Sequence, residues 1–438
     1  MSTTPLIAFY GDDFTGSTDV MEALSANGVE TVLFTQIPDD DFRSRFLTCR
    51  AFGLAGTSRS QSPEWMDAEL PGIFDWLAAS GARFLHYKVC STFDSAPRRG
   101  NIGRAVEIAL ARFDQKTAPV LVGAPQLRRY TFAGHLFAAY RDEIYRIDRH
   151  PVMSCHPATP MTESDLLLHL AAQTDLSSAK VNPADMAPPT TALALLDVHD
   201  DATQRWAGKW LAKNAATVGV ERGCFIAGSS GVEYALLPHW KETGDIGSPP
   251  RLAPLSPLSR LAVVSGSCSP TTARQIETAL SHGFSGIPVD FKALATGEGY
   301  QTAYESAHKA ASAALAEGRS AVIYTALGTS GIEMDANASG DDNAGRALGR
   351  LVSSLRQQEN LKRVVVAGGD TSSHALSEMD VGALTLRLPV PDSPGSPVCL
   401  AHAVKTEIPV FELVLKGGQI GGDDYFVRLR DGFSARLG

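Results

Sequence analysis

Two adjacent acids, Asp12 and Asp13, are the residues best suited to chemistry in the first half of the chain. They follow a short apolar run, residues 5–11, whose lack of helical spacing is typical of a buried parallel strand. A helix is predicted directly after them, and open α/β sheets bind ligands where strands end. A carboxylate there can accept the proton of a substrate hydroxyl or hold a cation. We expect at most one of the two merely to cap the helix, because adjacent carboxylates repel each other.

Basic and hydroxyl-bearing residues follow two other predicted strands in this half. Arg59 comes shortly after the predicted strand 51–56, and Lys88, Cys90 and Ser91 stand at the end of the predicted strand 83–88. We expect them on the same edge of the sheet as the two acids. Such a group suits a small polyhydroxylated acid, whose carboxylate the cations would hold. The plainer interpretations are a surface ion pair for Arg59 and a buried thiol for Cys90.

Three loops rich in glycine and hydroxyl groups follow predicted strands in the second half, at residues 265–269, 368–373 and 417–422. Glycine lets the backbone approach a ligand closely, and the N–H groups at a helix N-terminus hold phosphate. We predict that the loops bind a phosphate-bearing ligand, with the hydroxyls of Ser267 and Thr371 as further donors. Asp370 either holds a magnesium ion that bridges phosphates or caps the next helix. Neither a P-loop nor a dinucleotide-binding fingerprint is present.

Composition narrows the class of protein. The 438 residues are 44% hydrophobic and 20% charged, and the net charge of −9 argues against a nucleic-acid binder. The six cysteines include no CxxC pair, which favours reduced thiols over a zinc site or disulfides. The first residues show no secretory signal, and no apolar run approaches the roughly 20 residues that span a bilayer. We therefore expect a cytoplasmic protein with no nucleic-acid or membrane partner, and a homodimer stays open.

The order of the predicted elements indicates the architecture. Strands alternate with helices in both halves, which predicts an α/β fold of two domains, each with a mainly parallel sheet flanked by helices. Residues 144–160 are expected to form an ordered loop. A stretch rich in proline and glycine, 244–257, is predicted to be a linker between domains 1–243 and 258–438. The active site is expected in the cleft between the two domains.

An ordered series of motifs resembles the four-carbon acid sugar kinases, which phosphorylate tetronates and 3-oxo-tetronates with ATP. The resemblance covers nearly the whole chain, and the set is specific as a series. In this sequence the motifs are Gly11-Asp12-Asp13-Phe14-Thr15-Gly16, Thr57-Ser58-Arg59-Ser60, Lys88-Val89-Cys90-Ser91-Thr92, Arg99-Gly100-Asn101-Ile102-Gly103, His156-Pro157-Ala158-Thr159-Pro160-Met161, Ala227-Gly228-Ser229-Ser230-Gly231, Gly266-Ser267-Cys268-Ser269, Gly368-Gly369-Asp370-Thr371 and Lys416-Gly417-Gly418.

The resemblance implies an acid-sugar domain at the N-terminus and an ATP domain at the C-terminus. It implies substrate contacts at Asp12, Arg59, Lys88, Val89, Cys90 and Ser91. It implies nucleotide contacts at Ser267, Gly368, Gly369, Asp370, Thr371 and Gly418, to which we add Gly417 of the same loop.

Two departures from the family pattern fall in the substrate half. The family usually has an aspartate where Cys90 stands, and residues 93–98 interrupt the run that follows. The usual Gly-Arg-Thr element is replaced by residues 128–131. A branched or longer oxo-acid, such as 3-oxo-isoapionate, therefore joins the candidate substrates.

The predicted function is an ATP-dependent kinase, with magnesium, that phosphorylates a terminal hydroxyl of a small acid sugar. Asp12 or Asp13 would position and deprotonate that hydroxyl. One alternative is a phosphatase or lyase that uses the same anion sites on a phosphorylated sugar, without ATP. Another is a two-lobed sensor that binds an acid tightly and turns nothing over. The three glycine loops of the second half argue against a sensor, since binding a small acid does not require them.

Overall fold

The structure is a computed structural model that describes residues 4–156, 158–184, 189–218, 223–328, 338–406 and 411–434. Within these ranges the side chains of residues 218, 338–341 and 370 are not described. The chain forms two compact units. Unit 1 comprises Met1–Val32 and Phe46–Pro249, and unit 2 comprises Leu33–Arg45 and Pro250–Gly438. No helix in the described part of the chain is both long and apolar enough to cross a membrane.

The segment Leu33–Arg45 belongs to unit 2, although unit 1 continues after it. The N–H of Thr35 donates to the carbonyl of Gly382 at 3.1 Å. The guanidinium of Arg45 donates to the carbonyl of Thr406 at 2.6 Å. Backbone and side-chain hydrogen bonds of this segment thus go to residues more than 300 positions later in the chain, which no local sequence pattern reveals.

The strands of unit 1 are almost all parallel and buried. Their apolar side chains pack on both faces, as expected where helices cover a parallel sheet on both sides. In spatial order they are β2 (Thr31–Phe34, of which the last two residues belong to unit 2), β3 (Ala51–Ala55), β1 (Ile7–Gly11), β4 (Phe84–Lys88), β11 (Cys224–Gly228), β5 (Ala118–Leu121), β10 (Leu193–Leu196) and β9 (Ser178–Val181).

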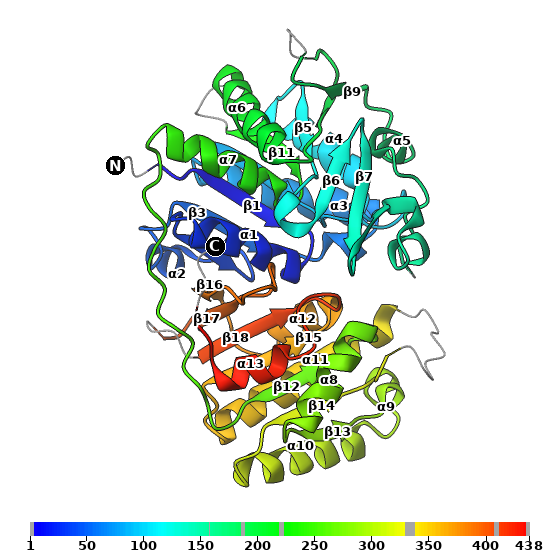
Figure 1. Ribbon diagram of the computed structural model, residues 1–438, viewed down its shortest axis with the longest axis vertical. Helices are drawn as coiled ribbons and strands as arrows, with labels where there is room; N and C mark the ends of the chain where they lie inside the picture. The colour runs from blue at the N-terminus through cyan, green and yellow to red at the C-terminus, as the bar shows by residue number, and fades with distance from the viewer. Residues whose placement is uncertain are drawn as a thin grey trace. The chain divides into compact units, whose positions relative to one another are not determined.

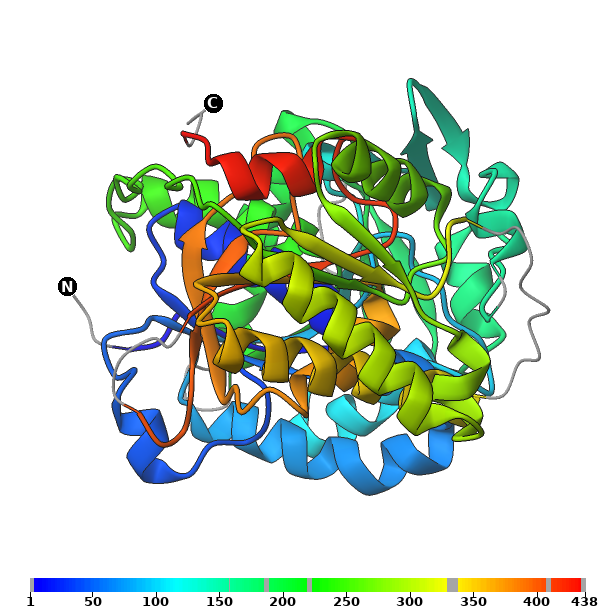
Figure 2. The same cartoon turned by 90° about the horizontal axis from the view of Figure 1, so that it is seen from below.

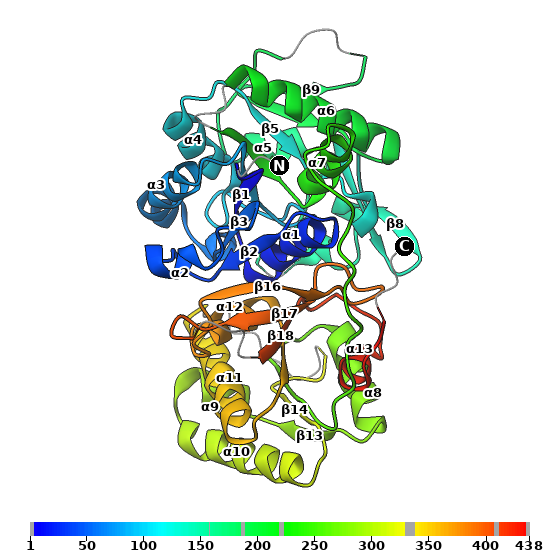
Figure 3. The same cartoon turned by 90° about the vertical axis from the view of Figure 1, so that its left-hand side faces the viewer.

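Helices cover both faces of these strands (Figure 1; Figure 3). In Figure 3, α3 and α4 lie on one face of the strands, and α1, α6 and α7 lie on the other. The helices of unit 1 are α1 (Phe14–Ala26), α3 (Pro63–Ala79), α4 (Ile102–Phe113), α5 (Leu166–Ala171), α6 (Asp201–Val218) and α7 (Gly231–Glu242), with short 3₁₀ turns η1 (Ser58–Ser60), η2 (Pro125–Leu127), η3 (Ile147–Arg149) and η4 (Met153–Cys155).

A small antiparallel sheet interrupts the parallel pattern of unit 1. It has three strands, β6 (Arg129–Phe132), β7 (His135–Tyr140) and β8 (Glu143–Arg146). This sheet was not expected from the sequence, and β8 begins at the edge of the stretch predicted to be a loop. Its strands are short and only partly buried, so their apolar residues give little periodic signal.

Unit 2 repeats the α/β pattern and adds two antiparallel strands at one end. In spatial order the strands are β13 (Ser285–Pro288), β14 (Ala321–Tyr324), β12 (Ala262–Ser265), β15 (Arg363–Ala367), β18 (Phe411–Lys416), β17 (Val398–His402) and β16 (Ala383–Leu388). The pairs from β13 to β18 are parallel, and β17 runs antiparallel to both of its neighbours β18 and β16.

The helices of unit 2 also lie on both faces of its strands. Helices α10 and α11 stand in front of the strands in Figure 2, and α8 packs with α13. The set is α2 (Asp40–Ser44), α8 (Pro270–Ser281), α9 (Phe291–Thr296), α10 (Tyr300–Ala316), α11 (Ala338–Gln358), α12 (Gly369–Leu376) and α13 (Tyr425–Asp431). The predicted class, α/β with a mainly parallel sheet flanked by helices, is confirmed.

Candidate functional site

The central strands of unit 1 end at one level. Parallel pairing places Gly11 opposite both Ala55 and Lys88, and it places Lys88 opposite Gly228. These are the last residues of their strands, so the loops that follow them leave the carboxyl edge of the sheet side by side. The register thus brings together the residues that the sequence pointed to, namely Asp12, Asp13, Arg59, Lys88 and Cys90.

The carboxylate of Asp13 caps helix α1. Its Oδ1 accepts the N–H of Gly16 at 2.8 Å, and its Oδ2 accepts the hydroxyl of Thr15 at 2.6 Å. Oδ1 also accepts a hydrogen bond from Nη2 of Arg59 at 3.0 Å. Both oxygens of Asp13 are therefore engaged by the protein, as expected for one of the two acids.

Asp12 and Arg59 form a two-point hydrogen bond. Nε of Arg59 donates to Oδ2 at 3.2 Å, and Nη2 donates to Oδ1 at 2.8 Å. The Asp12 side chain is only 5% exposed and that of Arg59 is 25% exposed, so the pair is largely shielded from water. Forked contacts of this kind are strong and directional, and they hold Asp12 in one orientation.

Burial changes the acidity of Asp12. It raises the pKa of this carboxyl from 3.8 to about 6, although the charge of Arg59 opposes the rise. The neighbouring charge of Asp13 raises the pKa of Asp12 further. A carboxyl with a pKa near 6 is ionised at neutral pH and still basic enough to accept a proton during a reaction.

The ammonium group of Lys88 lies beside the first turn of α1. The residue is 2% exposed, and no carboxylate in the described part of the chain lies within 4.0 Å of it. Its charge acts on Asp12 and Asp19 from farther away. Residue 16 must be small, because a Cβ there would lie 2.9 Å from Nζ of Lys88 and 2.3 Å from Oδ1 of Asp13.

A further acid, Asp94, joins the site, and no sequence motif had singled it out. It is 6% exposed, and it accepts the hydroxyls of Thr92 at 2.5 Å and Thr159 at 3.2 Å. Burial alone would raise the pKa of Asp94, but Arg59 and Thr92 outweigh that effect and hold this pKa below its usual value. Asp94 lies in an irregular segment beyond the strand end, so only its neighbours in space reveal it.

The three residues after Lys88 differ in what they offer. The N–H of Val89 donates to the carbonyl of Gly228 at 2.7 Å, which continues the strand pairing. Burial and the charge of Asp94 raise the pKa of the Cys90 thiol, so it is protonated at neutral pH and is a poor nucleophile. The side chain of Ser91 is half-buried and makes no hydrogen bond with the described residues.

A buried hydrogen bond between His86 and Glu233 supports β4. His86 and Glu233 are both inaccessible to solvent, with Nδ1 and Oε1 2.7 Å apart. Nε2 of His86 lies 3.1 Å from the carbonyl of Gly228 and must carry a proton, because a carbonyl only accepts. Breaking such a pair exposes an uncompensated polar group to the interior. The pair therefore holds in place the strand that carries Lys88.

The central strands of unit 2 also end at one level. Ser265 lies opposite Ala367, and Ala367 lies opposite Lys416. The three loops predicted to bind phosphate therefore leave the sheet together, and all of them belong to unit 2. Helix α8 follows the first loop, and helix α12 follows the second.

These three loops interlock through glycines and hydroxyl groups. A Cβ on Gly266 would lie 2.3 Å from Oγ1 of Thr371, and a Cβ on Gly368 would lie 2.7 Å from the same atom. A Cβ on Gly418 would lie 3.1 Å from Oγ of Ser267. Gly368 also has φ of +122°, a conformation that favours glycine. The predicted nucleotide contacts therefore form one compact group.

The N-terminus of α12 has no side-chain cap. Gly368 occupies its cap position and has no side chain with which to cap the helix. The first N–H groups of the helix, from Gly369 on, therefore have no side-chain cap and can bind an anion. Gly417 has only Ile420 near its Cβ position, at 3.4 Å, so packing alone does not require glycine there. The side chain of Asp370 lies outside the described part, and its assignment to magnesium stays a prediction.

Lys416 ends β18 beneath this group and was not predicted as a contact. It is fully buried, and Nζ donates to the hydroxyl of Thr272 at 3.0 Å and to the carbonyl of Gly417 at 2.8 Å. Burial lowers the pKa of Lys416 from 10.5 to about 7. No carboxylate in the described residues lies within 4.0 Å of the amine, so an anion in the loops would be its first full charge partner.

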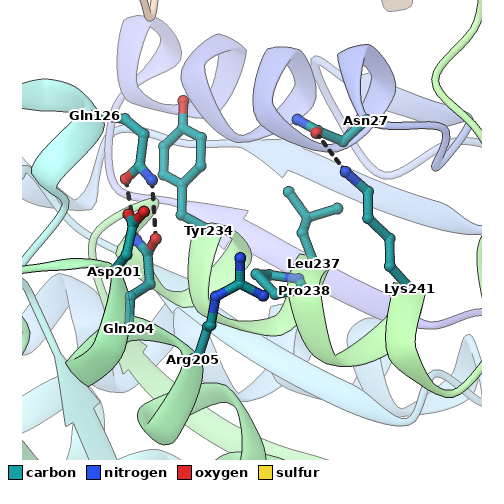
Figure 4. Close-up of a pocket in the computed structure, with 9 residues that line it drawn as sticks. All are labelled: Asn27, Gln126, Asp201, Gln204, Arg205, Tyr234, Leu237, Pro238 and Lys241. Atoms are coloured by element: carbon teal, nitrogen blue, oxygen red, sulfur yellow. Dashed lines mark hydrogen bonds between the residues drawn. The ribbon is translucent and has the colours of Figure 1, made fainter.

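The described residues contain no group of three or more His, Cys, Asp or Glu side chains that could hold a metal ion. A surface cavity of about 280 Å³ lies among α1, α6 and α7 (Figure 4). Its amides Gln126 and Gln204 bond each other at 2.9 and 3.0 Å, and Lys241 donates to Asn27 at 3.3 Å. These four polar side chains are paired with one another, so we assign the cavity no ligand.

Comparison with known proteins fits this division of sites. Residues 7–236 match the model of a sugar-binding N-terminal domain, and residues 262–426 match that of a nucleotide-binding C-terminal domain. A 3-oxo-isoapionate kinase of Paraburkholderia graminis is 42% identical over 98% of this chain and 94% of its own length. The 3-oxo-tetronate kinases of Cupriavidus necator and Pseudomonas fluorescens are each 28% identical, over 96% of both chains.

Solved structures show the same fold at lower identity. A Salmonella typhimurium LT2 protein superimposes with a TM-score of 0.73 and 24% identity, over 96% of this chain and 98% of its own. A Haemophilus influenzae protein superimposes with a TM-score of 0.67 and 23% identity, over 97% and 99%.

Fold, site and matched domains thus define a two-unit α/β enzyme that joins a sugar-binding to a nucleotide-binding domain. The chain belongs to the four-carbon acid sugar kinase family. It is an acid sugar kinase that uses ATP, and neither the sensor nor the phosphatase or lyase alternative is favoured.

The first prediction concerns Gly16. We expect Gly16→Ala to lower kcat/KM for the acid sugar at least roughly tenfold, because the new Cβ displaces both the Asp13 cap and the Lys88 ammonium. Gly72→Ala is the matched control, since Gly72 lies in helix α3 with nothing within 4 Å of its Cβ position. Steady-state kinetics and thermal melting of both variants test this. Full activity of Gly16→Ala would contradict the role given to this turn.

The second prediction concerns Lys416. We expect Lys416→Met to raise KM for ATP roughly tenfold and to leave KM for the acid unchanged, because the amine lies against the phosphate-binding loops. Phosphate nearby raises a lowered lysine pKa, so nucleotide binding by the wild type should take up a proton near pH 7.5. Calorimetry in buffers of different ionisation enthalpy measures that uptake. The exposed Lys362→Met serves as control, and an unchanged KM for ATP in Lys416→Met would refute the assignment.

Proposed function

We propose that the enzyme phosphorylates a terminal hydroxyl of a small oxo-acid sugar, with 3-oxo-isoapionate as the first candidate and 3-oxo-tetronates as the second. The observation that carries the proposal is the cluster of buried acids and cations at the strand ends of unit 1. The 42% identity to a 3-oxo-isoapionate kinase orders the candidates. The departures from the family pattern at Cys90 and residues 93–98 support the same order of candidate substrates, since they alter the loop next to Lys88.

Asp12 is the proposed general base. The oxygens of Asp13 are occupied by the helix cap and Arg59, whereas the side chain of Asp12 bonds, among the described residues, only to Arg59. The raised pKa of Asp12, about 6, suits a group that accepts a proton at neutral pH. Arg59 orients the carboxylate and keeps it ionised between reaction cycles.

Phosphoryl transfer needs little more than positioning and charge stabilisation. The hydroxyl oxygen of the sugar attacks the γ-phosphorus of ATP, the bond to the β-phosphate oxygen breaks, and ADP leaves. The hydroxyl proton passes to Asp12. The ammonium of Lys88, which has no ion pair within 4.0 Å in the described residues, stabilises negative charge on the sugar side. The reaction requires that the sugar site and the nucleotide site meet during turnover.

The loops of unit 2 are the proposed ATP site. Ser267, Thr371 and the open N-terminus of α12 would hold phosphate oxygens, and Lys416 would add positive charge beneath them. Magnesium that arrives with ATP is coordinated largely by phosphates and water, with one or two protein carboxylates. Asp370 is the proposed carboxylate, and the ion would neutralise charge on the phosphates. We also expect the enzyme in the cytoplasm, where ATP is made.

The direct test is release of ADP from ATP and magnesium in the presence of single acids. The panel comprises 3-oxo-isoapionate, the 3-oxo-tetronates, threonate and erythronate. We expect ADP release that depends on an acid, with an oxo-acid fastest. Binding of an acid without turnover would point to the sensor, and turnover of a phosphorylated sugar without ATP to the phosphatase or lyase. Either result would overturn the proposal.

The third prediction is a pH dependence set by Asp12. Below about pH 6 the base becomes protonated, so kcat/KM should fall roughly tenfold per pH unit, while it stays constant from about pH 7 to 8. Asp12→Asn should lower kcat by about a hundredfold or more. The exposed Asp175→Asn is the matched control and should keep both rate and profile. If kcat/KM of the wild type does not fall below about pH 6, Asp12 is not the base.

A further inference from the structure

The guanidinium of Arg129 is a feature near the sugar site that the proposed mechanism leaves unused. Arg129 begins β6, the first strand of the small antiparallel sheet. Its Nη1 donates to the carbonyls of Leu127 at 3.1 Å, Arg128 at 3.2 Å and Ala139 at 3.3 Å. Nε is buried and has no hydrogen-bond partner, and Nη2 makes no hydrogen bond with the described residues.

No acid compensates this charge. Within the described part of the chain, no carboxylate lies within 4.0 Å of Arg129. Burial lowers the pKa of Arg129, and the charge of Arg128 lowers it further. Arg129 is half-buried, and holding an unpaired cation partly away from water costs free energy, which a bound anion would offset.

Another buried arginine of the chain shows the usual arrangement. Arg363 is 1% exposed, and its Nη2 lies 2.6 Å from Oε2 of Glu412. Its remaining donors reach the carbonyls of Leu429 and Ser256. Arg59 in the sugar site is likewise matched by Asp12 and Asp13. Arg129 differs from these two arginines, because its Nε–Nη2 edge bonds to no carboxylate in the described residues.

Backbone pairing places Arg129 at the same edge of the sheet as the sugar site. The N–H of Ala124 donates to the carbonyl of Arg129 at 2.8 Å, and the N–H of Arg129 donates to the carbonyl of Ala124 at 3.1 Å. Ala124 comes shortly after β5, whose last residue Leu121 lies opposite Gly228, and Gly228 lies opposite Lys88. Arg129 therefore approaches this edge from the antiparallel sheet, whereas Lys88 belongs to the parallel one.

We propose that Arg129 binds the carboxylate of the sugar acid, an inference that rests on the proposed function. A carboxylate matches the two parallel donors of an Nε–Nη2 edge. On Arg59, Nε and Nη2 are already engaged by Asp12 and Asp13. Nε of Arg129 is covered, so binding must shift the side chains over it, an ordinary adjustment at a binding site. Arg129 then selects acids over neutral sugars, and Asp12 serves the reacting hydroxyl.

The test compares two substrates that differ only in the carboxylate. For 3-oxo-tetronate the neutral partner is erythrulose, in which a hydroxymethyl group replaces the carboxylate. If another panel acid is turned over faster, its hydroxymethyl analogue is used in the same way. The variants are Arg129→Gln, Arg129→Lys and the control Arg128→Gln, whose exposed guanidinium bonds, within the described part of the chain, only to the carbonyl of Arg141. Thermal melting and KM for ATP verify that each variant is folded.

We expect Arg129→Gln to lower kcat/KM for the acid roughly ten- to a hundredfold, mainly by raising KM. The kcat/KM for the neutral sugar should change less than about twofold. The preference for the acid then largely disappears. Arg129→Lys should recover part of this preference, because lysine keeps the positive charge but lacks the two parallel N–H donors of arginine. Arg128→Gln should behave as the wild type.

Two outcomes would overturn the assignment and leave the kinase intact. Equal losses for the acid and the neutral sugar would show that Arg129 only braces the loop, and an undiminished preference for the acid would place the carboxylate elsewhere. If the wild type releases no ADP with any acid, the proposed function itself fails and this inference fails with it. Calorimetric binding of the acid to wild type and Arg129→Gln separates these cases without turnover.

Discussion

Register between parallel strands is the constraint on which both sites depend. In unit 1, hydrogen bonding aligns the last residues of β3, β1, β4 and β11, and in unit 2 it aligns those of β12, β15 and β18. Loops that start at one level can place short side chains against each other. A slip of one residue would turn every side chain of a strand to the opposite face, so the buried helical layers that specify the register also specify the sites.

Charge buried at these strand ends is costly, and the two units balance it differently. Among the described residues, unit 1 sets Arg59 against two carboxylates and leaves Lys88 and Arg129 without ion pairs, so the proposed anionic substrate would complete the balance. Unit 2 buries Lys416 against carbonyls and a hydroxyl, and this burial depresses its pKa to about 7. In both units the proposed ligand would supply the missing counter-charge.

Glycine serves the two sites in different ways. Gly16 leaves space for a cap and an ammonium group, and its own conformation is helical. Gly368 combines a positive φ with a close approach to Thr371, so the residue is required by backbone conformation as well as by space. Gly417 has neither restriction, and its contact with the nucleotide stays a prediction.

The sequence by itself determined the class of fold and most of the strand ends, because buried parallel strands are continuous apolar runs that end in polar loops. Asp12, Arg59 and Lys88 followed from that rule, since each stands just past such a run. Only the tertiary structure decided the rest. Asp94 and Arg129 lie in irregular or half-exposed segments without periodic signal, and their roles depend on neighbours far away in the chain. Long-range packing alone decides which buried charges find partners.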